Sequence, residues 1–439
     1  MLNVLADRTY RHLFLAQIVA LLGTGLATVA LGLLAYDLAG DNAAMVLGTV
    51  FTIKMVAYVG IAPVAGAFAD RVNRRALLVT LDLIRAACAL ALPFVAEVWQ
   101  VYVLIFLLQS ASAAFTPTFQ ATIPDVLPEE DRYTRALSLS RLAYDLENIV
   151  SPTLAALLLA VMSYNSLFLG TVAGFVGSAL LVVSVMLPSP TASEPRGVYD
   201  RITRGIQIYL ATPRLRGLLA LNIAVAAAGA MVLVNSVVLV RGSLGLSDSA
   251  LAWTMFAFGA GSMTAALLLP RLLDRLPDRP VMLAGAGLMV GTLLCLAAMV
   301  AGAGLDWRML LGAWLLIGFG YSAVLTPSGR LLRRSAHAED RPAVFAAQFA
   351  LSHACWLVSY PLSGWLMTRF GTIPALLVLA AVAAIGIVAS LRLWPAHEAD
   401  EVEHTHDNLP PDHPHLRGHK RHSHPLVIDD RHPKWATHF

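Results

Sequence analysis

The sequence predicts an all-α membrane protein with twelve transmembrane helices in two pseudo-symmetric six-helix halves, and three observations support this fold class. Of its 439 residues, 57% are hydrophobic and 13% are charged, so a water-soluble globule could not hide this much apolar surface. The apolar residues form runs of about twenty, the length that crosses a bilayer as a helix. Several features of the first half also recur in the second.

Twelve apolar runs follow one another along the chain, and each predicts one membrane span. They cover residues 12–38, 44–68, 76–95, 101–123, 134–162, 167–187, 218–240, 250–273, 280–301, 309–331, 343–367 and 373–394. The first run is too long for the apolar region of a signal peptide and lacks a small-residue cleavage site. We therefore expect it to remain as the first span.

The distribution of arginine predicts the orientation of these spans. With the N-terminus inside, the five inner loops hold 18 Lys and Arg residues, and the outer loops hold only Arg241, Arg308 and Arg369. Because cytoplasmic loops retain positive charge, both termini are expected in the cytoplasm. The basic residues are not clustered with aromatic ones, which disfavours a nucleic-acid partner.

Composition and internal repeats divide the chain into four parts. Residues 1–187 and 216–394 form the two predicted halves, a polar segment at 188–215 links them, and a tail follows at 395–439. Such a duplication is typical of secondary transporters, which carry their substrate path between the halves. The recurring features are Asp70 and Asp274, Thr116 and Thr326, and Glu130 and Glu339, at offsets of 204, 210 and 209 residues.

The turn between the second and third runs carries the clearest motif. It reads Gly66-Ala-Phe-Ala-Asp70-Arg71-Val-Asn-Arg74-Arg75, and these five numbered positions match Gly-x-x-x-Asp-Arg-x-x-Arg-Arg. It resembles the signature loop of the major facilitator superfamily, although Asn73 replaces a glycine usual there. The resemblance implies the major facilitator fold, with a central path that opens alternately to each side. The alternative is an ordinary positive-inside loop.

Ionisable residues at membrane depth are costly and therefore point to function. In the fifth run, Asp145, Glu147 and Asn148 lie within one helical turn. Arg141 precedes Asp145 by four residues and could pair with it, whereas Glu147 points about 200° away around the helix. We expect Asp145 and Glu147 to carry a proton or a metal ion.

Three further features of the apolar runs enter the prediction. By the offset of 209 residues, His353 corresponds to the position beside Asp145, and we expect it, with Asn148, to support the two acids. A buried histidine bonded to a neighbour is the alternative. Asp82 and Arg85 lie three residues apart, so they share a helix face and predict a structural ion pair.

Beyond Trp394 the sequence changes to a tail that holds ten of the thirteen histidines. Its prolines and acidic residues predict disorder, and neutral imidazole suits Ni(II), Zn(II), Co(II) and Cu(II). We expect several loose metal sites; a solvated low-complexity tail or an expression tag is the alternative. The candidate ligands are His404, His406, His413, His415, His419, His422 and His424.

Residues 114–128 and 133–148, followed by this tail, together resemble the bacterial nickel-resistance exporters of the same superfamily. The resemblance implies a monomer in the bacterial inner membrane that exports Ni(II), with Co(II) as a second candidate, by proton antiport. The ion would be cargo, and no resident cofactor is expected. One alternative is an exporter of an organic solute such as a siderophore or hydrophobic drug; another is a membrane-anchored metal buffer or sensor. The sequence lacks HExxH, GxSxG and a nucleotide-binding glycine loop, so we expect no enzyme.

Overall fold

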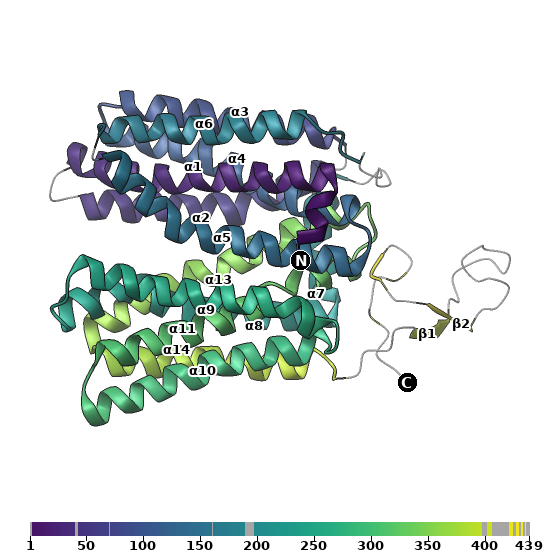
Figure 1. The fold of residues 1–439 in the computed structure, drawn as a ribbon. Helices are drawn as coiled ribbons and strands as arrows, with labels where there is room; N and C mark the ends of the chain where they lie inside the picture. Colours follow the sequence, from purple (N-terminus) through teal and green to yellow (C-terminus); the bar gives the residue numbers. More distant parts are fainter. Residues whose placement is uncertain are drawn as a thin grey trace.

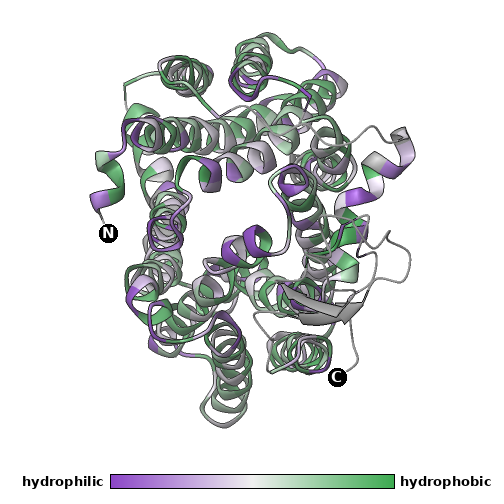
Figure 2. Ribbon diagram, turned by 90° about the vertical axis from the view of Figure 1, so that its right-hand side faces the viewer, coloured by the Kyte–Doolittle hydropathy of each residue, from purple (hydrophilic) through white to green (hydrophobic). Residues whose placement is uncertain are grey.

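The chain folds into two groups of long helices that lie one above the other, with both termini at the same end (Figure 1). The computed structural model describes residues 2–39, 43–69, 71–159, 161–188, 197–396, 402–405, 421–424, 427–429, 432 and 435. Viewed from the end that carries the termini, the helices form a ring, and hydrophilic residues gather in the loops around its centre (Figure 2).

The first half contains six long helices and two short 3-10 turns, η1 (Leu2–Ala6) and η3 (Leu92–Phe94). The helices are α1 (Arg8–Ala39), α2 (Ala43–Phe68), α3 (Arg74–Ala91), α4 (Val98–Val126), α5 (Glu130–Leu159) and α6 (Tyr164–Val183). Side chains start several of them. Asn73, which departs from the family motif, caps α3 by accepting a hydrogen bond from the backbone N–H of Ala76 at 3.1 Å.

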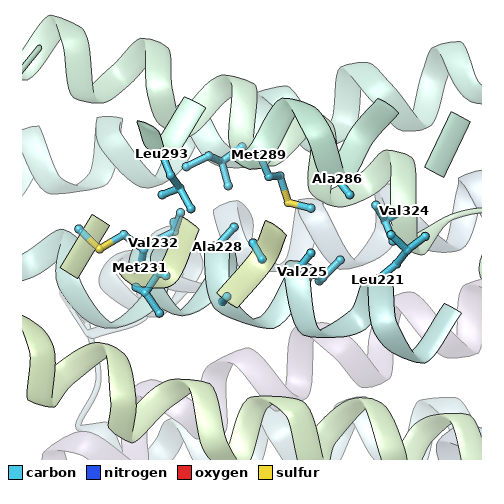
Figure 3. Packing of buried hydrophobic residues seen from close by; sticks show 14 of the residues in the cluster. Leu221, Val225, Ala228, Met231, Val232, Ala286, Met289, Leu293 and Val324 are labelled. Carbon is cyan, nitrogen blue, oxygen red and sulfur yellow. The ribbon is translucent and has the colours of Figure 1, made fainter. Parts of the chain in front are cut away.

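The second half repeats this arrangement. It contains α8 (Pro213–Val237), which ends in a π-helical turn (Val238–Ser243), α9 (Asp248–Leu273), α10 (Asp278–Ala303), α11 (Trp307–Leu325), the short α12 (Ser328–Arg334), α13 (Arg341–Phe370) and α14 (Thr372–Leu393). The core between α8, α10 and α11 is built from Leu, Val, Ala and Met side chains (Figure 3).

Glycines set the closest contacts between helices. A Cβ atom at Gly318 of α11 would lie 2.0 Å from the Phe258 carbonyl oxygen of α9, and one at Gly261 of α9 would lie 1.9 Å from that of Leu315. Neither position has room for any other residue unless a backbone moves. Small residues therefore allow the tight packing on which helix association in a membrane depends.

The fold class predicted from the sequence is confirmed. In the described part of the chain, eleven helices are long and apolar enough to cross a membrane by composition. The twelfth long helix, α5, is not among them, because several of its side chains lie outside the described residues; its sequence carries Arg135, Arg141, Asp145 and Glu147. It packs mainly against α1 and α9, at the junction between the halves.

The linker and the tail both contain more regular structure than the sequence suggested. Helix α7 (Val198–Ala211) lies in the linker and packs against α13 and α2, with Ile208 and Tyr209 fully buried. In the tail, β1 (Val402–Thr405) pairs antiparallel with β2 (Arg421–His424). The tail was expected to be disordered; these eight described residues pair as strands, and neither strand contains a proline to interrupt the pairing.

Candidate functional site

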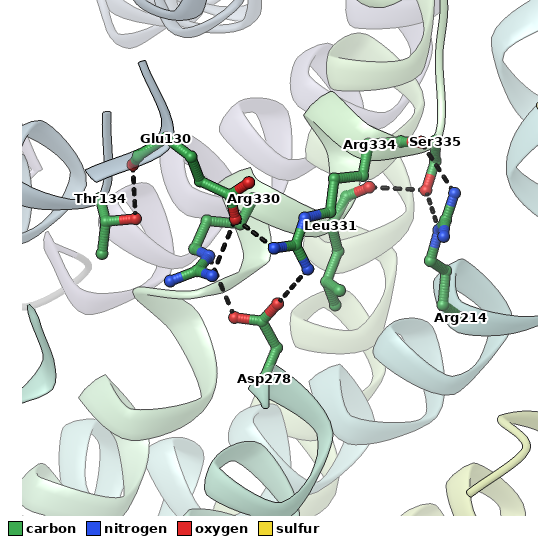
Figure 4. Close-up of polar contacts among 8 residues, drawn as sticks. All are labelled: Glu130, Thr134, Arg214, Asp278, Arg330, Leu331, Arg334 and Ser335. Atoms are coloured by element: carbon green, nitrogen blue, oxygen red, sulfur yellow. Dashed lines mark hydrogen bonds and ion pairs between the residues drawn. The ribbon is translucent and has the colours of Figure 1, made fainter. Parts of the chain in front are cut away.

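Charged residues from both halves meet at the end of the bundle that carries the termini (Figure 4). Glu130, at the start of α5, accepts bonds from Arg330 at 2.8 Å and from Arg334, both on α12. The same two arginines also pair with Asp278 of α10, at 3.3 and 3.1 Å. A carboxylate of the first half is thus held by two guanidinium groups of the second.

A second ion pair crosses between the halves close by. The carboxylate of Asp125 on α4 receives Arg74 of α3 and Arg341 of α13, both at 2.5 Å. Arg74 belongs to the first half and Arg341 to the second. Five groups bridge the halves: the carboxylates Glu130 and Asp125, their partners Arg330 and Arg334 on α12, and Arg341 on α13. We call these five groups the ionic latch.

The motif residues lie beside this latch. Gly66 of α2 packs against α13: an added Cβ would lie 2.5 Å from the Cβ of Ala346 and 3.1 Å from the Pro342 carbonyl oxygen. Arg74 is buried and joins Asp125, whereas Arg71 and Arg75 are exposed. Asp70 lies outside the described residues. The loop therefore places one glycine and one arginine at the contact between the halves.

Deeper in the bundle, polar and aromatic groups of both halves meet at a second place. Lys54 of α2 lies over the ring of Tyr58, 5.5 Å from its centroid, and its charge acts on both Glu147 of α5 and His353 of α13. The rings of Tyr58 and His353 meet edge to face at 4.8 Å. The Nδ1–H of His353 donates to the Phe349 carbonyl oxygen at 2.7 Å.

On the other side of α5, Arg141 reaches into the second half. Its Nε donates to the hydroxyl of Ser262 on α9 at 3.0 Å, and its guanidinium lies 4.8 Å from the ring centroid of Tyr321 on α11. The ring of Tyr321 also contacts that of Trp356, with the centroids 6.3 Å apart, and Trp356 contacts Tyr360, with the centroids 4.9 Å apart. We call Lys54, Tyr58, Arg141, Glu147, Tyr321, His353 and Trp356 the interfacial cluster.

The sequence-predicted acids are only partly described. Glu147 is half-buried and faces α1, where a Cβ added to Gly25 would lie 3.4 Å from its Oε1. The side chains of Asp145 and Asn148 lie outside the described residues, although both positions belong to α5. The charge of one cation, Lys54, thus acts on both Glu147 and His353.

The sequence did not reveal the neighbours of Lys54. It is the only lysine before position 420, and it stands in the middle of an apolar run. That isolation was a signal, since an intramembrane lysine requires a nearby counter-charge. Its partner lies 93 residues further along the chain, on a helix that spacing alone could not place beside α2.

The predicted ion pair of Asp82 and Arg85 is confirmed. Both side chains are buried in the first half, where Asp82 also accepts a hydrogen bond from Ser178 of α6 at 2.8 Å. The Arg85 guanidinium lies between the rings of Phe115 and Phe175, 4.0 and 4.5 Å from their centroids. This pair lies inside one half and ties α3 to α6 and α4.

No cluster of three or more metal-ligand side chains occurs among the described residues. His406, His413, His415 and His419 of the tail lie outside them. The β1–β2 register makes His404 the cross-strand partner of His422, and His424 that of Val402.

A later part of the tail lies against the second half. Ile428 is buried, Asp429 contacts His337 at 3.6 Å, and the Arg214 guanidinium lies 5.5 Å from the Trp435 ring centroid. The hydrogen bond to Asp429 raises the pKa of His337. Burial alone would raise the pKa of Asp429, but the bonds from His337 and His432 outweigh it and lower that pKa.

Two curated relatives share part of the sequence. Macrolide efflux protein A of Streptococcus pyogenes is 32% identical over 152 residues, which are 34% of this chain and 37% of that protein. Multidrug resistance protein MdtG of Dickeya zeae is 29% identical over 161 residues, which are 36% of this chain and 39% of that protein. The matched region therefore spans less than half the length of either relative.

Solved structures share the fold over nearly their whole length. The human organic anion transporter MFSD10 has a TM-score of 0.73 at 12% identity and covers 87% of this chain and 99% of its own. A bacterial homologue of the iron transporter ferroportin has a TM-score of 0.72 at 15% identity, with 88% and 99% covered. The sequence profile of the Major Facilitator Superfamily matches residues 13–238 and 218–428, so the protein belongs to this superfamily of membrane transporters.

Proposed function

We propose that the protein exports apolar organic solutes, of the kind that macrolides represent, from the cytoplasm in exchange for protons. The observation that carries this proposal is the interfacial cluster. It contains the rings of Tyr321 and Trp356, with Tyr360 packed against Trp356, and the opposite charges of Lys54 and Glu147. The named functions of the two partial relatives support the same class of substrate.

The aromatic rings suit a large apolar solute. Aromatic faces bind flat apolar groups by stacking and bury area without requiring exact hydrogen-bond partners. Tyr321 also presents a face to Arg141, and Phe258 packs against it with ring centroids 5.4 Å apart. These groups come from α5, α9, α11 and α13, so a solute among them would contact both halves.

Glu147 is the candidate proton carrier. Ionised, Glu147 attracts the charge of Lys54 on α2; protonated, it no longer does so. Exchange of the proton would therefore change the attraction between α5 and α2, two helices of the first half that lie near the contact between the halves. Asp145 and Asn148 remain candidates for the same role, with His353 as a supporting group.

Under this proposal, the ionic latch indicates which end of the transport path is closed in the structure. The arginine-rich loops indicate that the latch end faces the cytoplasm, in the inner membrane of a bacterium. With Glu130 and Asp125 bound by arginines of the second half, that end is closed. The structure would then correspond to the state that releases solute outward.

Drug accumulation in a pump-deficient bacterial host tests the proposal. Cells that express the protein should hold less erythromycin than empty-vector cells, and dissipating the proton gradient should remove the difference. Glu147→Gln should abolish export at unchanged membrane expression. Glu129→Gln, which neutralises an exposed acid outside the cluster, should not. Equal accumulation with and without the protein, for macrolides and for other apolar drugs, would refute the substrate class.

Export of a divalent metal is the second candidate, and the ten tail histidines favour it. The tail would collect Ni(II), Co(II) or Zn(II), and the acids of α5 would pass it on. Vesicle transport of radioactive nickel with and without a pH gradient separates the two functions. Removal of residues 395–439 should then weaken nickel export without abolishing it; cells that retain metal instead of losing it would indicate a membrane-anchored buffer.

A further inference from the structure

A cavity of about 160 Å³ lies beside the ionic latch. Residues of both halves line it: two belong to α5 of the first half, and the others belong to α12 and α13 of the second. Its lining residues are Glu130, Tyr133, Arg330, Arg333, Arg334 and Arg341. The volume is several times the roughly 30 Å³ that one water molecule occupies in the liquid, so a small polyatomic ion fits inside.

Positive charge exceeds negative charge around this cavity. Arg330 and Arg334 share the carboxylates of Glu130 and Asp278, and Arg341 shares Asp125 with Arg74. Arg333 is the remaining guanidinium, and among the described residues its hydrogen bond goes to a backbone oxygen, that of Pro128. Arg333 thus forms no ion pair with a described carboxylate, and the charge of Glu130, which acts on it, is already shared with Arg330 and Arg334.

Three buried donors at the cavity also lack a hydrogen-bond acceptor among the described residues: the Tyr133 hydroxyl and the Nε atoms of Arg330 and Arg341. The Tyr133 side chain is 1% exposed, yet its hydroxyl has no partner; neither does the Nε of Arg341. Tyr133 is held in place, since the Arg333 guanidinium lies 5.5 Å from its ring centroid and Gly329 packs against its hydroxyl. A buried donor without an acceptor destabilises the fold, and a bound acceptor would relieve this.

We propose that this cavity binds a phosphate-type oxyanion. Guanidinium groups present paired N–H donors that match the oxygens of a phosphate, and Tyr133 adds an O–H donor from α5. A cation would be repelled, and an apolar group would leave the donors unsatisfied. The phosphate group comes either from a free anion in the cytoplasm or from the headgroup of an anionic lipid at the membrane surface.

Binding at this place favours one conformation. Tyr133 and Glu130 belong to the first half, and the four arginines belong to the second, so the complete site exists only while the latch is closed. An anion that binds the closed state better shifts the equilibrium toward it, by as much as its affinities for the two states differ. This inference does not depend on which solute the protein carries.

Thermal unfolding of the purified full-length protein in detergent, at about pH 8 where histidine is neutral, tests the site. The unfolding temperature should rise with inorganic phosphate along a single-site saturation curve, compared with sodium chloride at equal ionic strength. In Arg333→Gln the half-saturating concentration should rise about tenfold, the effect of losing one charged hydrogen bond. Tyr133→Phe should raise it several-fold, and Arg275→Gln, an exposed arginine at the same end, should leave it unchanged.

Nanodiscs identify the source of the phosphate group. Phosphatidylcholine discs with and without phosphatidylglycerol are compared in the presence of inorganic phosphate. A stabilisation by phosphatidylglycerol that removes the phosphate response indicates the lipid headgroup, and a retained response indicates the free anion; both support the site. The proposal is overturned if neither phosphate nor phosphatidylglycerol raises the unfolding temperature, or if Arg333→Gln responds as Arg275→Gln does.

Discussion

Replacing Arg341 with glutamine tests how strongly the two halves are held together. In the structure a guanidinium nitrogen of Arg341, in the second half, lies 2.5 Å from a carboxylate oxygen of Asp125 in the first half. Arg74, also of the first half, binds the same carboxylate. After Arg341→Gln the carboxylate keeps Arg74, so no isolated charge is left buried. The variant therefore removes one ion pair between the halves, together with one guanidinium that lines the cavity beside the latch.

The expected effect is about thirtyfold. A hydrogen bond between charged groups contributes about 1.5–3 kcal/mol, and the side chains of Arg341 and Asp125 are only 19% and 16% exposed, so solvent screens the bond weakly. A loss of about 2 kcal/mol corresponds to a change of about thirtyfold in the ratio of open to closed latch. The latch should therefore open more often without unfolding of either half.

Electron–electron distance measurements between two spin labels can detect this opening. Labels at Val72 and Leu276, both exposed in turns of opposite halves, replace these residues in a chain whose three native cysteines are substituted. Arg341→Gln should transfer population to longer distances, and adding Glu130→Gln should transfer more. Arg75→Gln, an exposed charge at the same end, is the control. An unchanged distance distribution in the double variant would show that these ion pairs do not hold the halves together.

Three other outcomes follow from the packing and the charges. Gly318→Ala should lower the unfolding temperature measurably, since overpacking is destabilising by about 1–3 kcal/mol, whereas Gly287→Ala, which meets no atom within 4 Å, should not; equal stabilities would contradict the close contact. Asp82→Asn should be destabilising by about 3–5 kcal/mol because it leaves a buried guanidinium unpaired, and a normal yield of folded protein in detergent would refute this. Because the folded-state pKa of His337 is raised, its contact with Asp429 is fully present below about pH 6.5 and is lost as the pH rises through that pKa. Proteolysis of the tail should therefore quicken between about pH 6 and about pH 8, and His337→Ala should remove this dependence.

The sequence alone predicted the features that depend on local pattern. Apolar runs located the long helices, and the spacing of Asp82 and Arg85 predicted their pairing on one face. Helix α7 was missed because the linker is polar overall. Its apolar residues fall on one side only when the segment is drawn as a helix. From the sequence, the arginines of α12 were assigned only to a positively charged cytoplasmic loop. Their pairing with Glu130 could not be predicted, because Glu130 lies 200 or more residues earlier.

The candidate site was predicted less completely than the fold. Glu147 and His353 were selected as rare ionisable groups in apolar runs, but their common neighbour Lys54 follows from how α2, α5 and α13 meet. Contacts between the halves depend on how two separately folded halves dock, which no local period encodes. The metal hypothesis rests on the tail histidines and stays a prediction.

The polarity of α5 also constrains how the chain is inserted during synthesis. Each ionised residue near the middle of a span opposes insertion by about 2.5–3.5 kcal/mol, and α5 carries Arg141, Asp145 and Glu147 there. We expect α5 to partition poorly into lipid by itself and to need α1, its earlier-made neighbour, before it can leave the translocon. In a glycosylation-mapping assay, α5 fused alone to a reporter should stay largely uninserted, whereas the stretch from α1 through α5 should integrate. Efficient insertion of the lone helix would show that its charges are shielded without companions.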